Sequence, residues 1–192
     1  GDFFSESNES RTFFEDAEDL AEGGMKQSLE NFYHQVLEQE GVQLNFDLIE
    51  DDTDGNYYNL NIGNTQFSIF KEDSDSSWSK AYYGLIEICN LLLEKANSKE
   101  QFYFNEDDIR YDGKIMVLTD EQFEYLRKQK KFLNKHWMPI KWQNMNFKRL
   151  KDNFNPLEKP STALHKTCHL EFENTTFLDS TIHGYINFPQ SF

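Results

Sequence analysis

The residues of this sequence that could do chemistry are a histidine and cysteine group near its end and several clusters of carboxylates. His165, Cys168 and His169 fall within five positions, and a thiolate with two imidazoles is a ligand set that zinc accepts. Their spacing matches neither the C-x2-C pairs nor the H-E-x-x-H helix of common zinc sites. A simpler interpretation is a late strand that exposes the two histidines and buries the cysteine. His165, Cys168 and His169 are kept as candidate ligands, but no metal or other cofactor is expected.

An acidic turn in the first third of the chain invites comparison with a calcium-binding loop. Its residues are Glu50, Asp51, Asp52, Asp54 and Gly55. Carboxylates stand at the first, third and fifth positions and glycine at the sixth, as a calcium loop requires. The twelfth position, however, is Asn61 rather than a bidentate glutamate, and alternating strands flank the turn. Asp54-Gly55 is a strong signal for a β-hairpin, and the sequence predicts one here.

No catalytic signature is present in the sequence. It has no G-x-S-x-G, phosphate-loop, dinucleotide or H-x-E motif, and its glycines are scattered at turns. No catalytic residue is therefore predicted. A hydrolase or nuclease that uses carboxylates needs only two or three acids, and the chain has 34 Asp and Glu residues from which to draw them. Such an enzyme, or one built on the histidine and cysteine group, remains an alternative.

The net charge of −15 is concentrated in the first half of the chain. Residues 1–60 contain 16 Asp or Glu residues against only Arg11 and Lys26. A negative surface of this kind attracts basic partners, raises their association rates and helps to select among them. The candidate partner-binding residues are Glu15, Asp16, Asp19, Glu50, Asp51, Asp52 and Asp54.

A basic segment lies near the other end. Nine Lys or Arg residues occur between Arg127 and Lys151 with no acid among them, and aromatic residues such as Trp137 and Trp142 are interleaved. Cations beside aromatic rings suit single-stranded nucleic acid. The same pattern also fits a solvated helix face or an internal counterpart of the acidic half. The net negative charge of the protein disfavours nucleic acid as its partner.

Hydrophobic periodicity predicts an α+β fold. We expect an antiparallel sheet, made of a three-stranded meander and a later hairpin, packed against two to four helices. Residues 1–10 have the composition of a flexible amino-terminal segment, and residues 11–192 are expected to form a single domain.

The predicted elements follow from local patterns. Helical spacing of apolar residues predicts helices over residues 12–21, 25–37, 78–96, 119–132 and 147–154. Alternation and turn signals predict strands over residues 42–48, 58–62, 67–69, 102–111, 114–118, 169–172 and 182–188. Thr119 and Gln122 form a capping-box pattern at the start of the fourth helix.

These features favour a binding protein over an enzyme. We expect an acidic immunity or inhibitor protein of bacterial type, which blocks the active site of a basic, nuclease-like toxin. An alternative is an inhibitor whose carboxylates mimic DNA, although the basic segment argues against it. The negative mean hydropathy and the lack of long apolar runs argue against a membrane protein. Two widely spaced cysteines suit the cytoplasm, and the oligomeric state stays open.

Overall fold

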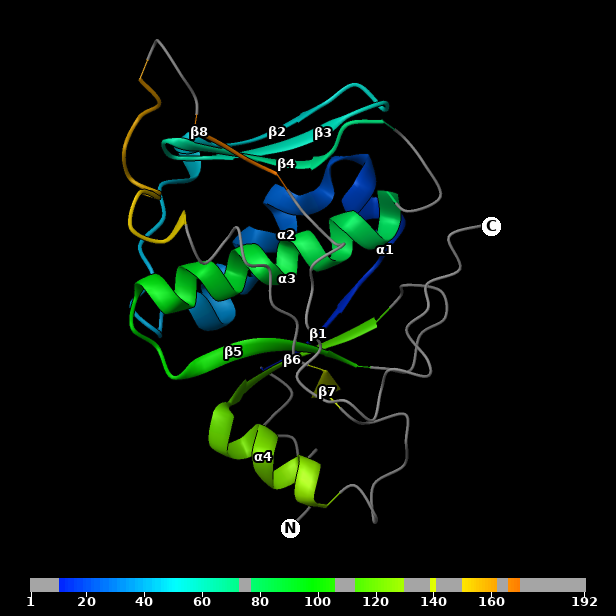
Figure 1. Ribbon diagram of the computed structural model, residues 1–192, viewed down its shortest axis with the longest axis vertical. Helices are drawn as coiled ribbons and strands as arrows, with labels where there is room; N and C mark the ends of the chain where they lie inside the picture. Colours follow the sequence, from blue (N-terminus) through cyan, green and yellow to red (C-terminus); the bar gives the residue numbers. More distant parts are fainter. Residues whose placement is uncertain are drawn as a thin grey trace.

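The protein is built in layers. The computed structural model describes residues 11–72, 77–105, 113–129, 139–140, 150–161 and 166–169. In these ranges, two four-stranded sheets enclose a layer of helices, and helix α4 covers the outer side of one sheet (Figure 1). This mixed content confirms the predicted α+β class.

The upper sheet in Figure 1 has the strand order β2-β3-β4-β8. Its strands are β2 (Ile49–Thr53), β3 (Tyr58–Ile62), β4 (Thr65–Phe70) and β8 (Lys166–His169). Antiparallel pairing of β2, β3 and β4 confirms a three-stranded meander, although its first strand is Ile49–Thr53 and not the predicted range 42–48. Gly55 and Gly63 occupy its turns with φ of 90° and 56°, which glycine adopts without strain. β8 pairs parallel to β4. It begins three residues before the strand predicted over 169–172 and shares only His169 with it.

The lower sheet has the strand order β1-β6-β5-β7. Its strands are β1 (Thr12–Glu15), β5 (Glu100–Asn105), β6 (Gly113–Thr119) and β7 (Pro139–Ile140). Antiparallel pairing of β5 with β6 confirms the predicted hairpin, although its turn lies outside the described residues. The hairpin forms this separate sheet instead of extending the meander. The helices can therefore bury apolar faces on both sides.

Helices α2 (Met25–Phe32) and α3 (Ser77–Lys95) lie between the sheets, whereas α4 (Asp120–Lys128) does not (Figure 1). The shorter helical segments are α1 (Ala17–Asp19), the π-helical turns η2 (Leu20–Gly24) and η3 (Tyr33–Leu37), and the 3-10 turn η4 (Phe46–Leu48). α3 contacts strands of both sheets and is buried along most of its length. α4 packs Phe123 and Leu126 on the lower sheet, and its predicted capping box between Thr119 and Gln122 is present.

Residues 12–21 do not form the predicted helix. The first four of them are strand β1, paired antiparallel with β6, and the helix begins only at Ala17. Phe13 is 4% exposed and Phe14 is 71% exposed, which is the alternation of a strand. The spacing from Phe13 to Ala17 resembles a helical turn, but it crosses Asp16, whose side chain caps the true helix start.

The strand predicted over residues 42–48 is also wrong. Residues 42–45 have no regular structure, and the next three form η4. The Asn45 side chain accepts the N–H of Asp47 at 3.1 Å, and the Asn45 carbonyl accepts the N–H of Leu48 at 2.9 Å. These local bonds compete with strand pairing. Strand β2 starts at Ile49, the residue that follows the end of the predicted range.

Several predictions fall outside the described residues. These are the flexible segment over residues 1–10, the strand over 182–188 and residues 147–149 of the helix predicted over 147–154. The rest of that last range forms a turn, in which the N–H of Phe154 donates to the Leu150 carbonyl at 3.0 Å, and Phe154 is buried against Phe67. No helix in the described part of the chain is long and apolar enough to span a membrane.

A side chain of α3 completes one edge of β5. Asn90 Nδ2 donates to the carbonyl of Phe102 at 3.0 Å, and Asn90 Oδ1 accepts the N–H of Phe102 at 2.6 Å. On this edge β7 pairs with β5 only at Phe104 and Asn105. The Asn90 amide therefore replaces a neighbouring strand and satisfies two backbone groups that are shielded from water.

Replacing Asn90 by leucine should destabilise the fold. The change removes both bonds and leaves the Phe102 N–H and C=O without a partner, at about 1–3 kcal/mol for each group. Urea denaturation should therefore show a fall of about 2–6 kcal/mol in the free energy of unfolding. Asn31→Leu, at an exposed position of α2, is the matched control and should change it by no more than about 0.5 kcal/mol. Equal losses in the two variants would contradict this role.

Candidate binding surface

The two acidic stretches of the sequence come together in the structure. Segment α1–η2 packs against β2, and a Cβ on Gly23 would lie 3.6 Å from Thr53 Cγ2. Gly23 has a φ of 115°, which kinks the chain between η2 and α2. The acidic residues of α1–η2 and of the β2–β3 hairpin therefore belong to elements that pack together, and this set of acids is here called the acidic surface. It comprises Asp16, Glu18, Asp19, Glu22, Glu50, Asp52 and Asp54.

Asp51 faces inward and is part of the frame. Its carboxylate accepts the N–H of Lys26, at 3.2 Å to Oδ1 and 3.3 Å to Oδ2, and the hydroxyl of Tyr58. The Tyr58 hydroxyl in turn accepts the N–H of Met25 at 3.2 Å. Burial, and then the bond to Asp51, raises the pKa of Tyr58, so this hydroxyl keeps its proton and donates it. Unlike an exposed carboxylate, the predicted contact residue Asp51 therefore already has bonds to two other elements of the fold.

Three other predicted carboxylates also have bonds within the chain. Glu15 Oε2 accepts the Ser28 hydroxyl at 2.6 Å, and burial raises the Glu15 pKa more than this bond lowers it. Asp16 caps α1 by accepting the N–H of Glu18 at 2.8 Å. Asp54 Oδ1 accepts two backbone N–H groups in the hairpin turn, the nearer at 2.9 Å. Asp16 and Asp54 remain exposed, so they shape the backbone and still present charge.

Asp19 and Glu50 are the predicted residues that are most open to a partner. Both are exposed, and neither forms a side-chain hydrogen bond or ion pair with the described residues. Glu18 and Glu22 are exposed beside Asp19 on the same segment. These four carboxylates have no local cation to neutralise them within the described residues. They give the acidic surface its negative potential.

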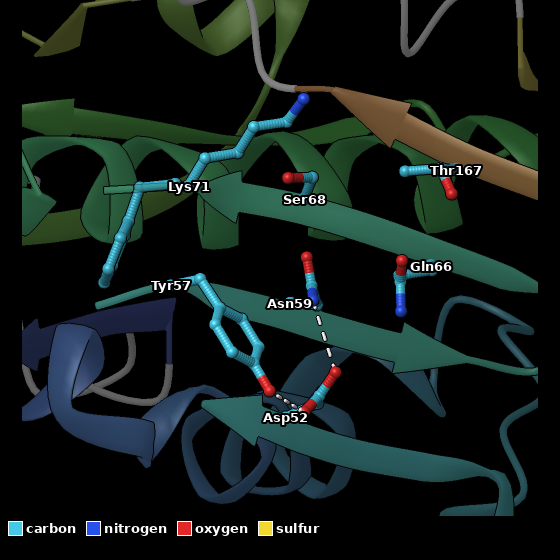
Figure 2. Close-up of a pocket in the computed structure, with 8 residues that line it drawn as sticks. Asp52, Tyr57, Asn59, Gln66, Ser68, Lys71 and Thr167 are labelled. Atoms are coloured by element: carbon cyan, nitrogen blue, oxygen red, sulfur yellow. Dashed lines mark hydrogen bonds between the residues drawn. The ribbon is translucent and has the colours of Figure 1, made fainter. Parts of the chain in front are cut away.

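A hollow on the outer face of the upper sheet contains the last predicted residue, Asp52. Its volume is about 370 Å³, and Figure 2 shows polar side chains from β2, β3, β4 and β8 on this face. The lining residues are Asp52, Tyr57, Asn59, Gln66, Ser68, Phe70, Lys71 and Thr167. Most of these were not predicted, because their meeting depends on the strand register. The available signal was that Tyr58, Leu60 and Ile62 face inward, which turns the intervening residues outward.

Two polar rows cross the upper sheet. Strand register aligns Asp52 with Asn59 and Asn59 with Ser68 in one row. In the second row, Glu50 lies opposite Asn61, Asn61 opposite Gln66, and Gln66 opposite Thr167. Side chains that are aligned on one face of a sheet lie close enough to act together. These two rows therefore place carboxylate, amide and hydroxyl groups on the outer face of the sheet.

Asp52 is held in one orientation by two neutral donors. Tyr57 Oη donates to Asp52 Oδ1 at 2.9 Å, and Asn59 Nδ2 donates to Oδ2 at 3.2 Å (Figure 2). The bond to Asp52 raises the pKa of Tyr57, which keeps that hydroxyl protonated. Asp52 forms no ion pair with the described residues. It is thus a half-buried, oriented carboxylate that an external cation could reach.

The candidate metal ligands are not brought together by the described residues. Cys168 is 6% exposed and lies opposite Phe67, within the main core. His165 and the side chain of His169 lie outside the described residues. Among the residues that the structure places, no group of three or more His, Cys, Asp or Glu residues could hold a metal ion.

The basic residues of the segment from Arg127 to Lys151 are described only at its two ends. Arg127 pairs with Glu124 on α4 at 3.0 Å, and Lys151 pairs with Glu94 on α3 at 3.3 Å. Neither pair involves the acidic surface.

No match to the chain was found among protein-family models, curated proteins or solved structures.

The inward position of Asp51 predicts a pH dependence of stability. Burial raises the Asp51 pKa above its ordinary value, despite the lowering effect of its hydrogen bonds. The folded state thus binds this proton more tightly than the unfolded state, and the resulting stabilisation is lost as pH rises through the raised pKa. Asp51→Asn removes this dependence and keeps an acceptor for Tyr58. Relative to the parent protein, the variant should gain unfolding free energy as pH rises from about 4, the ordinary pKa of an aspartate, through the raised pKa of Asp51.

Chemical denaturation at several pH values measures this difference. Glu15→Gln offers a second case with the same sign, since burial also raises the Glu15 pKa. A difference between Asp51→Asn and the parent that falls with rising pH would contradict the assignment.

Proposed function

We propose that this protein binds a basic protein partner through the acidic surface and acts as a bacterial, cytoplasmic immunity or inhibitor protein that blocks the active site of a nuclease-like toxin. The observation that carries the proposal is the arrangement of Asp19, Glu22 and Glu50. These exposed carboxylates come from distant parts of the sequence, are carried by α1, η2 and β2, of which η2 and β2 pack together, and form no ion pair with the described residues. Active sites that bind nucleic acid are positively charged, which makes them complementary to such a surface.

The internal acids support the same function in a different way. Asp51 and Asp16 hold the β2–β3 hairpin and the start of α1 in place through bonds to backbone N–H groups. The exposed carboxylates are therefore presented on a defined frame, which lowers the entropy that binding must remove. Unpaired surface charges also steer a partner of opposite sign over distances of about a Debye length, roughly 8 Å at physiological salt. Rapid association is an advantage for a protein that must neutralise a toxin.

The test uses the basic protein encoded by a gene adjacent to the gene for this chain. Stopped-flow mixing should give an association rate that falls steeply with added salt, and the complex should lose the nuclease activity of the partner. The double variant Asp19→Lys/Glu50→Lys should lower the association rate about 10- to 100-fold at low salt. Reversal of two unpaired charges in the contact region weakens the attraction without disturbing a described bond.

The control is Glu38→Lys/Glu121→Lys, which changes the net charge equally. Glu38 follows η3 and Glu121 lies on α4, and both are exposed away from the acidic surface. This control should slow association by no more than about threefold, as a general charge effect. Equal slowing by both double variants, or no complex with a basic neighbour, would refute the proposal.

A further inference from the structure

The hollow on the upper sheet has unused hydrogen-bonding capacity at its carboxylate. An ionised carboxylate has about four lone-pair positions. Tyr57 and Asn59 each occupy one position, on different oxygens of Asp52. Both donors are neutral, so the negative charge is oriented without being neutralised. Each oxygen of Asp52 can accept one more bond, which is the arrangement that a bidentate donor requires.

The two ends of the hollow differ in charge. Figure 2 shows the Lys71 side chain extending away from Asp52, toward the opposite side of the hollow. Lys71 forms no ion pair with the described residues. A cation that enters the hollow is therefore drawn to Asp52 and repelled from Lys71. The charge distribution thus sets the position of a bound cation.

The groups near Asp52 suit a planar cation. The Tyr57 ring borders the carboxylate, and a guanidinium group stacks on aromatic rings more readily than an ammonium group does. Gln66 and Ser68 on β4 supply further oxygen acceptors along the same face. A guanidinium group has five N–H donors in a fixed plane and can use several such acceptors at once. A lysine ammonium group is a compact, strongly hydrated charge that gains less from this geometry.

We propose that this hollow binds an arginine side chain of the partner, with Asp52 accepting two N–H groups of the guanidinium. The inference rests on the proposed function, because it names the contact that would give the basic partner its specificity. The exposed acids attract any cationic surface, whereas an oriented carboxylate beside Tyr57 selects arginine over lysine. Buried or half-buried arginine contacts of this type are frequent among the residues that dominate binding energy.

The probes are two blocked tripeptides, acetyl-Gly-Arg-Gly-amide and acetyl-Gly-Lys-Gly-amide, titrated into the full ¹⁵N-labelled chain. Nuclear magnetic resonance reports the side-chain amide signals of Asn59 and Gln66, which lie in the hollow. The arginine peptide should shift these signals and bind several-fold more tightly than the lysine peptide. Asp52→Asn should weaken arginine binding about tenfold, since it replaces a charge-assisted bidentate contact by a neutral one.

Glu50→Gln is the matched control, because it removes the same charge from the same strand and is outside the hollow. It should alter arginine binding less than about twofold. Tyr57→Phe retains the charge of Asp52 and removes the hydroxyl that orients it, so it should also weaken arginine binding. Thermal denaturation of each variant verifies that the fold is intact.

Unshifted amide signals, equal binding of the two peptides, or equal losses in Asp52→Asn and Glu50→Gln would overturn the inference. The proposed function has an independent readout in the salt-dependent association with the basic neighbour. If Asp52→Asn leaves that complex unchanged while Asp19→Lys/Glu50→Lys slows its formation, the arginine site is refuted and the proposed function stands.

Discussion

The start of helix α2 depends on a cap that another element supplies. Gly24 stands at the cap position and has no side chain to bond the free N–H groups of the first turn. Asp51 and Tyr58, from two paired strands, accept the N–H groups of Lys26 and Met25 instead. A larger residue at position 24 would be crowded, because a Cβ there would lie 2.7 Å from the Asp19 carbonyl oxygen. The helix layer and the upper sheet are thus joined by groups that neither could satisfy alone.

This cap also determines which acids face outward. Successive side chains of a strand point to opposite faces, so an inward Asp51 places Glu50 and Asp52 on the outer face. A register slip of one residue would withdraw the carboxylate from the helix and turn Asp51 outward. The bond that stabilises α2 therefore also orients the outer face of the hairpin. η2, which directly follows Asp19 in the chain, packs on β2 beside Thr53.

Local sequence signals predicted those parts of the fold that have a local cause. The Asp54-Gly55 turn, the periodicity of α3 and the capping box of α4 are each set by residues within a few positions of one another. Strand β1 was missed because its pairing partner, β6, lies about a hundred residues away, and its apolar spacing also fits a helix. The parallel pairing of β8 with β4 likewise has no local signature.

The acidic residues were found by composition, but their roles could not be distinguished from composition. Asp51 and Asp52 are adjacent and chemically identical, yet one caps a buried helix end and the other lines an open hollow. The difference comes from the register of β2 with β3 and from the packing of α2, both of which are long-range. Composition likewise did not show that Asn59 and Tyr57 would orient Asp52.

The carboxylates differ in whether they are bonded within the chain or exposed, and this difference has an energetic consequence for binding. Acids such as Asp51 accept backbone N–H groups within the fold. If such an acid bonded a partner instead, those N–H groups would be left unpaired, at a cost of about 1–3 kcal/mol each. Fully exposed acids, such as Glu50, add long-range attraction but little to the affinity of a contact pair, about 0–1 kcal/mol. Asp52 lies between these limits, since its orientation is already set in the free protein and two acceptor positions remain. Attraction and selectivity can therefore reside in different residues of a single sheet face.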